Sequence, residues 1–371
     1  MEYIFEDVLE IKNGKNQKAV ENSEGLYPIY GSGGVMGYAD DYICDADTVI
    51  IGRKGNINNP IYVNERFWNV DTAFGLSAKR ELLLPRYLFY FCKKFDFEKL
   101  NKTVTIPSLT KSDLLKIKID LPVISEQQDV VDRLSKIEAV IELRKQKLSA
   151  LDDLIKARFV EMFGDAVANP MQWPVKKLKE LSVQINSGNT PKGGSENYVE
   201  EGITFFRSQN VWKDRLEMDD IAYIDAATHA SMKRSSLKHG DILMTKTGRI
   251  NTENSSLGRA ALYDGEDDMA NVNGHVYFIR LKEGINNKFV LRILVSPEYR
   301  ELIRSVCVGG IDKRQLNKEH IEDFPIICPP SDMVNDYILF VEQVDKSKVA
   351  VQKALDETKL LFDSLMQQYF G

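Results

Sequence analysis

The chain has 371 residues, more than one hydrophobic core usually organises, so we expect two or three domains. Hydrophobic residues make up 43% and charged residues 28%, a composition that excludes disordered, collagen-like and wholly coiled-coil proteins. The 49 Lys and Arg residues against 55 Asp and Glu give a net charge of -6. That balance argues mildly against a nucleic-acid-binding protein, which usually carries an excess of basic residues.

The four cysteines, Cys44, Cys92, Cys307 and Cys328, lie far apart and form no C-x-x-C pair. This usage is typical of a reducing compartment and predicts neither a disulfide framework nor a zinc site. The histidines form no cluster with the cysteines, so we expect no bound metal. The N-terminus does not resemble a signal peptide, and no apolar stretch reaches the ~20 residues that span a membrane. We therefore expect a soluble, cytoplasmic protein.

Residues 1–124 contain short runs of β-branched and aromatic residues separated by Gly, Asn and Asp, which predict a mixed domain of strands and helices. Asp47–Gly52 predicts a strand, and Pro85–Leu100 predicts a helix. The glycine-rich segment Gly31–Gly37 lacks the third glycine of a dinucleotide-binding loop because Met36 stands there, so we expect a flexible loop or a hairpin. The sequence has no G-x-x-x-x-G-K-[ST] loop, which argues against ATP hydrolysis.

From about Glu126 to Met162 the chain has no Pro or Gly, and its apolar residues follow the heptad spacing of a long coiled-coil helix. Ser125 and Gln128 predict a capping box at its start, and Gly164 predicts its end. At about 1.5 Å per residue the helix would be roughly 55 Å long. Arg144 interrupts a predicted seam that consists of Leu134, Ile137, Ile141, Leu148, Leu151 and Ile155.

Residues 165–332 repeat the composition of the first globular part, with His275–Leu281 predicting a strand and Lys288–Val306 predicting one helix. A second long helix is predicted from about Met333 to Tyr369, with Lys348 and Thr358 in its seam. Its apolar seam residues are Val341, Val344, Val351, Leu355, Phe362 and Leu365. Because a long helix must bury its apolar stripe, we expect the two helices to pack antiparallel on each other. The alternative is two core helices in separate domains.

The chain contains an internal repeat. Residues 109–164 align without a gap with residues 316–371, and the apolar positions match. Further upstream Ile11–Gly14 resembles Ile185–Gly188, and Asp47–Ile51 resembles Asp241–Met244. We therefore predict an α+β protein with a pseudo-twofold repeat of a globular domain followed by a long helix. The predicted divisions are 1–124, 125–164, 165–332 and 333–371.

Polar loops follow the matched strands in both copies, at Gly52–Asn59 and at Thr245–Asn251. Arg and Lys side chains bind guanine edges, Asn and Gln bind adenine edges, and all of them hold phosphates. A polar loop can also be merely solvated, but recurrence in both copies favours a binding function. The candidate DNA-binding residues are Arg53, Lys54, Asn56, Asn58, Arg207, Gln209, Asn210, Lys246, Thr247, Arg249, Lys313 and Arg314.

The segment after the first long helix, Met162–Asp165 followed by Asn169-Pro170 and Trp173-Pro174, resembles the junction after the central conserved region of type I restriction-modification specificity (S, or HsdS) subunits. The segments Ile106–Gln128 and the one ending in Pro329-Pro330 resemble the entries to that family's conserved helices. The second helix departs from the pattern. Ser331-Asp332-Met333-Val334 stands where the family usually has a Glu-Gln pair, as at Glu126-Gln127.

The resemblance implies that each globular part is a target recognition domain that reads one half of a split, asymmetric site in double-stranded DNA. It implies that the antiparallel helices fix the spacer between the half-sites and dock two modification (methyltransferase) subunits. The chain itself would be non-catalytic and bind no cofactor. S-adenosylmethionine, ATP and Mg²⁺ would be bound by the methyltransferase and restriction subunits.

Two other classes of function stay open on the residues alone. A stand-alone nuclease or a fragment of a methylating enzyme would need clustered carboxylates or a (D/N)-P-P-Y type motif, and the sequence shows neither. A coiled-coil scaffold whose globular parts bind protein is the third possibility. Salt-insensitive binding would favour the scaffold, since phosphate contacts make DNA affinity fall steeply with salt.

Overall fold

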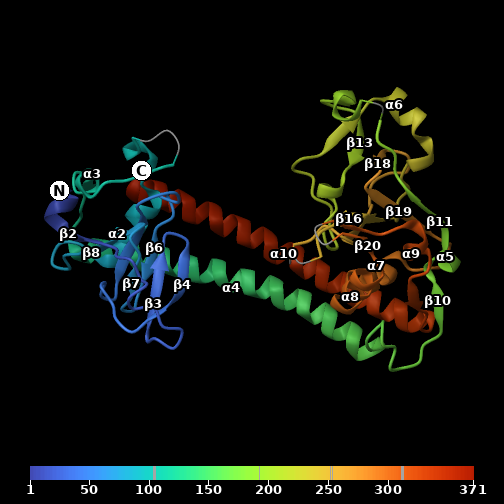
Figure 1. Cartoon of the computed structure of the whole chain (residues 1–371), viewed down its shortest axis with the longest axis horizontal. Coiled ribbons are helices and arrows are strands. Elements are labelled where there is room, and N and C mark those ends of the chain that lie inside the picture. Colours follow the sequence, from blue (N-terminus) through green and yellow to red (C-terminus); the bar gives the residue numbers. More distant parts are fainter. Residues whose placement is uncertain (103–105, 192, 251, 253, 311–312) are drawn as a thin grey trace. The chain divides into compact units, whose positions relative to one another are not determined.

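The computed structural model describes residues 1–102, 106–191, 193–250, 252, 254–310 and 313–371. The chain divides into two compact units. Unit 1 comprises residues 1–149 and 348–371, and unit 2 comprises residues 150–347. Two long helices of 40 residues each, α4 (Ile124–Phe163) and α10 (Ser331–Phe370), contribute residues to both units (Figure 1).

Unit 1 contains two sheets and a two-stranded ribbon around its helices. The main sheet has the antiparallel order β2-β8-β5-β6, the second has the order β4-β3-β7 with β3 and β7 parallel, and β1 pairs with β9. The strands are β1 (Glu2–Ile4), β2 (Leu9–Asn13), β3 (Tyr27–Gly31), β4 (Gly34–Ala39), β5 (Thr48–Gly52), β6 (Ile61–Val63), β7 (Trp68–Asn69), β8 (Ala73–Ala78) and β9 (Lys118–Asp120). The helices are α1 (Phe5–Val8), α2 (Pro85–Lys94), the 3-10 helix η1 (Phe97–Leu100) and α3 (Lys111–Leu114).

Unit 2 repeats this plan. Its main sheet has the order β11-β19-β15-β17, its second sheet has the order β12-β14-β13-β18 with β13 and β18 parallel, β10 pairs with β22, and β16-β21-β20 form a small extra sheet. The strands are β10 (Val175–Lys177), β11 (Ser182–Ser187), β12 (Tyr198–Val199), β13 (Ile203–Phe206), β14 (Ala222–Ile224), β15 (Ile242–Thr245), β16 (Thr247–Gly248), β17 (Ala260–Leu262), β18 (Ala270–Val272), β19 (Val276–Leu281), β20 (Val308–Gly309), β21 (Arg314–Gln315) and β22 (Pro325–Ile327). The helices are α5 (Leu178–Leu181), η2 (Gly194–Asn197), η3 (Ser208–Asn210), α6 (Ala226–Ser231), η4 (Lys233–Ser235), α7 (Asn287–Val295), α8 (Pro297–Val306) and α9 (Lys318–Glu322).

The predicted repeat is confirmed by these connections. In both units a short helix leads into the first strand of the main sheet, whose inner strands are β8 and β5 in unit 1 and β19 and β15 in unit 2. In both units a further short helix and an edge strand follow and lead into a long helix. The glycine-rich segment Gly31–Gly37, for which a flexible loop or a hairpin was predicted, lies in the β3–β4 hairpin. The predicted strands at Asp47–Gly52 and His275–Leu281 correspond to β5 and β19.

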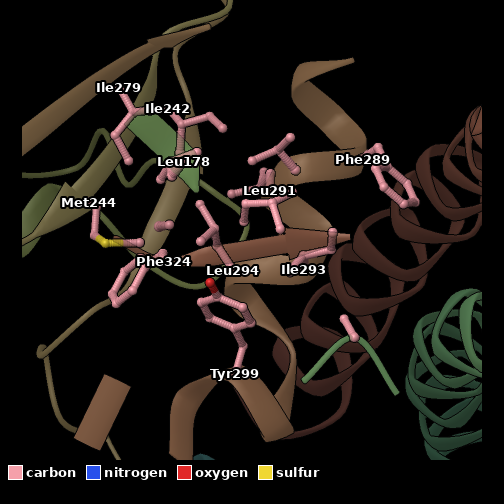
Figure 2. Close-up of a cluster of buried hydrophobic side chains, with 14 of the residues drawn as sticks. Leu178, Ile242, Met244, Ile279, Phe289, Leu291, Ile293, Leu294, Tyr299 and Phe324 are labelled. Atoms are coloured by element: carbon pink, nitrogen blue, oxygen red, sulfur yellow. The ribbon is translucent and has the colours of Figure 1, made fainter. Parts of the chain in front are cut away.

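The hydrophobic cores lie between the main sheets and the helices. In unit 2 the cluster joins Leu178 of α5 and Ile242 and Met244 of β15 to Leu291 and Ile293 of α7, and Figure 2 shows these residues in one buried cluster. In unit 1 the matching cluster combines β5 and β8 with α2 and with residues of both long helices. Each sheet therefore buries one face against helices, and its strand ends carry the loops.

The long helices run antiparallel, as predicted. In unit 1 Leu134 near the start of α4 shares a core with Phe362 near the end of α10. In unit 2 Ile155 near the end of α4 shares a core with Val341 near the start of α10. All the predicted seam residues are buried or half-buried. The polar seam residues Arg144 and Thr358 meet, since the Arg144 guanidinium donates to the Thr358 hydroxyl and to the Ala354 carbonyl.

Three local predictions were wrong. The helix predicted over Pro85–Leu100 ends at Lys94, and Phe97–Leu100 form the separate 3-10 helix η1. Ser125 does not cap α4, because the helix already begins at Ile124 and places Ser125 in its first turn. The region 288–306 is two helices rather than one, because Pro297 lacks the N–H that a continuous helix needs and instead starts α8, with Ser296 as its N-cap. The predicted end of the first long helix is confirmed: Gly164 has a φ of 74°, and its N–H bonds the Val160 carbonyl.

Candidate nucleic-acid interface

The two candidate loops begin at the same place in the two repeats, where β5 and β15 end. The N–H of Arg53 donates to the Thr72 carbonyl (2.8 Å), and the Arg53 carbonyl accepts from the N–H of Leu109 (2.9 Å). Lys246 forms the same pair of bonds, to the His275 carbonyl (2.8 Å) and from the N–H of Leu316 (2.9 Å). Because Leu109 and Leu316 are buried, both backbones are fixed at the sheet end. Arg53 and Lys246 are therefore equivalent positions.

The side chains at these two positions also have equivalent neighbours. The Arg53 guanidinium carbon lies 5.8 Å from the centroid of the Phe74 ring in β8. The Lys246 ammonium nitrogen lies 5.7 Å from the centroid of the Tyr277 ring in β19, one residue after the strand begins, as Phe74 is in β8. A cation over an aromatic face is held without neutralisation of its charge. Each repeat thus presents one oriented cation at the same end of its main sheet.

A polar pocket of about 460 Å³ lies beside the second of these loops. It brings together three predicted residues, Thr247, Arg249 and Lys313. The rest of the polar lining, which the sequence did not predict, is supplied by Thr252, Asn254, Ser255 and Ser256 together with Gly248. Among the residues that the structure describes, the lining has two cations and no carboxylate, so this part of the pocket suits an anionic or hydrogen-bonding ligand such as a phosphate or a base edge. Asn251, part of the predicted loop, lies outside the described residues.

Arg259 supports the wall of this pocket from behind, and the sequence analysis did not place it in the site. Its Nε donates to the Ser255 carbonyl at 3.0 Å, and its Nη2 donates to the Asn254 carbonyl. Its guanidinium carbon lies 3.8 Å from the centroid of the Trp212 ring. Burial, together with the nearby Arg300 and Arg215, lowers the Arg259 pKa. Trp212, a Trp in a loop, was the hint that the sequence offered. A Trp in a loop does not show which cation packs on its ring, so Arg259 could not be identified from it.

The first loop divides into contact candidates and a structural residue. Arg53, Lys54 and Asn56 are exposed. Asn58, also predicted to contact DNA, instead ties the loop to η1: its Nδ2 donates to Asp96 Oδ1 (3.1 Å), and its Oδ1 accepts from the N–H of Phe97 (2.7 Å). The structure therefore gives Asn58 a structural role, because both ends of its amide are already bonded within the protein.

The predicted cluster Arg207, Gln209 and Asn210 is organised around Asp220. Gln209 Nε2 donates to Asp220 Oδ2 (2.8 Å), and Arg207 forms an ion pair with the same carboxylate at 3.1 Å. These bonds lower the pKa of Asp220, the hydrogen bond from Gln209 most. Asn210 is only 1% exposed, and its amide bonds the backbone of Arg207, Glu217 and Asp220. Asn210 is therefore a buried structural residue, contrary to the prediction, and the other two are engaged within the protein.

The last predicted pair also separates. Lys313 is exposed and lines the pocket described above. Arg314 is half-buried in β21, and its Nη1 donates to the Cys307 carbonyl at 3.2 Å. Arg314 therefore holds the small sheet β16-β21-β20 to the end of α8, and Lys313 is the member of the pair that faces solvent.

The described residues contain no group of three or more His, Cys, Asp or Glu side chains placed to hold a metal ion. Over the same residues, none of the helices is both long and apolar enough to cross a membrane.

The known proteins that this chain resembles have the same description, specificity subunits of type I restriction systems. Residues 2–153 match the family described as "Type I restriction modification DNA specificity domain". The type I restriction enzyme MjaVIII specificity subunit of Methanocaldococcus jannaschii is 24% identical over 71% of this chain, which spans 62% of that relative's length. A putative type I specificity subunit of Haemophilus influenzae, S.HindORF215P, is 22% identical, and the match covers 98% of this chain and 92% of the relative.

Solved structures show the same fold over the whole chain. The S subunit of a type I restriction-modification system from M. genitalium superposes with a TM-score of 0.60 at 16% identity, covering 100% of this chain and 96% of that one. A chain from a study of type I system assembly and conformational transition superposes with a TM-score of 0.58 at 17% identity, covering 100% and 97%. The repeat and the paired long helices agree with these relatives: residues 2–153 match the type I restriction modification DNA specificity domain, and over its whole length the chain is similar to specificity subunits of type I systems.

Proposed function

We propose that this chain is the DNA specificity subunit of a type I restriction-modification complex. Each globular part reads one half of a bipartite, asymmetric DNA site, and the two long helices set the spacing between the half-sites. The chain contributes recognition, while methylation with S-adenosylmethionine and any ATP- and Mg²⁺-dependent cleavage belong to partner subunits.

The observation that carries this proposal is the recurrence of one oriented cation in two repeats. Arg53 and Lys246 have the same backbone bonds and the same aromatic neighbour, and both stand at the end of a main sheet. A single such cation is compatible with a solvated loop. Two such cations at equivalent positions, one in each copy of the fold, suit a ligand with two half-sites, such as a bipartite DNA site. The net charge of -6 averages these loops with acidic surfaces elsewhere.

The exposed apolar residues of the long helices support the docking of partner subunits. Leu143 of α4 is 63% exposed and Leu360 of α10 is 69% exposed, although both helices also have a buried seam. Such side chains are available to a partner protein, and an apolar patch built from them would be typical of a surface that another protein covers. We assign this surface to two methyltransferase subunits.

The experiment is a binding selection on a random DNA library with the chain purified together with its methyltransferase partner. We expect enrichment of two short conserved sequences separated by a spacer of fixed length and arbitrary sequence. The affinity should fall steeply with salt, since counterions are released from each neutralised phosphate. Enrichment of no bipartite sequence, with binding unaffected by salt, would instead support a protein-binding scaffold.

A further inference from the structure

The two repeats differ where the long helices begin, and the difference leaves a pocket in unit 2. In unit 1 the fully buried Gln127 joins the first turn of α4 to the segment before α2. Its Oε1 accepts from the N–H of Leu84 (2.9 Å), and its Nε2 donates to the carbonyls of Leu82 (2.8 Å) and Pro122 (2.9 Å). One primary amide therefore satisfies one backbone donor and two backbone acceptors.

Unit 2 has no glutamine at the start of its long helix, and the segment before α7 is one residue shorter than the segment before α2 when counted from the equivalent Lys79 and Lys282. Val334 occupies the position of Gln127 in the gapless alignment of residues 109–164 with 316–371, which also matches Pro122 with Pro329. Leu84 is the N-cap of α2, as Asn286 is the N-cap of α7, so Gly284 stands two residues before the cap, as Leu82 does. Among the described residues, no backbone hydrogen bond reaches the N–H of Asn286 or the carbonyls of Gly284 and Pro329.

These residues line one pocket of about 230 Å³. Gly284, Asn286, Pro329 and Val334 all belong to it, and the remaining lining is mostly apolar. Its volume is below the roughly 300–1,000 Å³ of most small-molecule sites, which favours a single side chain as the occupant. The lining includes no Asp, Glu, Lys or Arg, so a charged ligand would find no counter-charge.

We infer that this pocket binds a primary carboxamide, the side chain of a glutamine or asparagine presented by a partner protein, in the place that Gln127 fills from within unit 1. A primary amide has two N–H donors and one carbonyl acceptor, which complements two carbonyls and one N–H. A carboxylate has no donor and would face the carbonyls of Gly284 and Pro329 with its own oxygens. The binding of a carboxamide in this pocket does not depend on the proposed function. The identification of the partner as a methyltransferase subunit does rest on the proposed function.

Cys328 provides the readout, because it lines the pocket and is half-buried, while Cys44, Cys92 and Cys307 are buried. Burial raises its pKa, so the alkylation is measured at alkaline pH. In the alkylation by N-ethylmaleimide the Cys328 sulfur forms a bond to the maleimide carbon, and the thiol proton ends on the neighbouring carbon. The rate is followed by mass spectrometry of the full chain.

Propionamide is the probe, and N,N-dimethylpropionamide, which has no N–H donor, is the matched control. At twice its Kd propionamide leaves about one third of the pockets free, so alkylation should slow about threefold, and the dimethyl compound should leave the rate unchanged. In V334Q the tethered amide occupies the site, so added propionamide should no longer slow the reaction. Equal effects of the two amides on the wild-type chain would overturn the inference, even if V334Q failed to fold.

The partner is tested separately, without added amide. In a complex with the methyltransferase subunit we expect Cys328 to be alkylated several-fold more slowly than in the free chain. If the complex forms and Cys328 reacts at the free rate, the partner assignment is wrong while the proposed function stands. If no complex forms, the proposed function and the partner assignment both fail, and the comparison of the two amides still decides whether the pocket binds a carboxamide.

Discussion

The guanidinium of Arg53 lies over the ring of Phe74, with 5.8 Å between its central carbon and the ring centroid. The ring is 2% exposed and belongs to an inner strand of the main sheet, so the sheet fixes the direction of the cation. Lys246 and Tyr277 repeat the arrangement in unit 2. The two main sheets thus act as platforms that each aim one cation.

Replacing Arg53 with Ala should weaken binding to one half-site only. A base or phosphate contact by a fixed Arg is worth about 1–3 kcal/mol, so we expect roughly a tenfold to hundredfold loss of affinity for the intact site. Competition with oligonucleotides altered in one half at a time measures which half has lost discrimination. The loss of discrimination in both halves would contradict the assignment of one half to each unit.

Replacing Lys246 with Ala should produce the same loss at the other half-site, since Lys246 is the equivalent of Arg53. K282A is the matched control, because Lys282 is an exposed lysine directly after the opposite end of β19. Binding to the intact site should fall in K246A and stay within about twofold of wild type in K282A. Equal losses in both variants would mean that only the total charge matters.

Lys313 should act on phosphates rather than on bases. The residue is exposed at the edge of the polar pocket, where an ammonium group contacts an anion as a point charge. We expect K313A to lower affinity for all sequences alike and to reduce the slope of log K against log salt by about 0.9. A fluorescence-anisotropy titration across salt concentrations gives the slope, and an unchanged slope would rule out this contact.

The sequence predicted the repeat well because a long helix and a buried strand both leave an apolar pattern. It also matched the loops in register, so that Arg53, Lys54 and Gly55 correspond to Lys246, Thr247 and Gly248. The alignment of Asp47 with Asp241, by contrast, was wrong by one residue. Arg53 and Lys246 are equivalent, and counting back from them shows that Asp241 corresponds to Thr48.

The sequence could not predict whether a polar side chain is free to bind DNA or bonded within the protein, because its bonding partner is distant in the sequence. Asn58 bonds Asp96, and Asn210 bonds Glu217 and Asp220, so both are structural although their loops resemble binding loops. The same limit concealed the role of Gly14 and Gly188. A Cβ at either position would overlap a carbonyl, of Val70 or of Val272, and only the folded chain brings these groups together.

The contact between Arg144 and Thr358 should be a measurable coupling in the helix seam. R144A removes the guanidinium's bonds to Thr358 and to Ala354, and T358V removes the first of them, so each variant should lower the free energy of unfolding. A double-mutant cycle should give a coupling energy of about 0.5–1.5 kcal/mol. A coupling energy near zero would show that the two residues do not interact in solution.

The bond between Tyr62 and Asp47 should make stability depend on pH. The Tyr62 hydroxyl donates to Asp47 Oδ1 at 2.6 Å, which lowers the pKa of Asp47, with Arg80 adding to the effect. A lowered carboxyl pKa stabilises the folded chain above the unfolded value of about 3.9, and that stabilisation is lost as the pH falls through the folded pKa. Y62F should therefore cost about 1 kcal/mol at neutral pH, allowing for the partial exposure of Asp47.

Denaturant unfolding of wild type and Y62F from pH 7 to pH 3 checks this prediction. The difference between the two proteins should shrink as the pH falls below about 4 and the carboxyl group takes up its proton. A difference that is the same at every pH would assign the whole effect of Y62F to packing.

Replacing Leu143 with Asp should weaken the binding of the methyltransferase subunit without unfolding the chain. Leu143 is 63% exposed on α4 and lies outside the predicted seam, so the change removes an apolar side chain and adds a charge on the surface that we propose docks the partner. We expect at least about a tenfold weaker complex by calorimetry, with circular dichroism unchanged. K136D on the same helix, at an exposed polar position, is the control for added negative charge.

DNA recognition by the two repeats is tested by a genome-wide map of methylated adenines in cells that carry the gene, lack it, or carry it as K246A. DNA recognition by two repeats predicts one bipartite methylated motif that depends on the gene. In K246A, recognition should relax or fail in one half of the motif while the other half keeps its sequence. A map that is identical with and without the gene, in cells where the methyltransferase partner is active, would contradict the account.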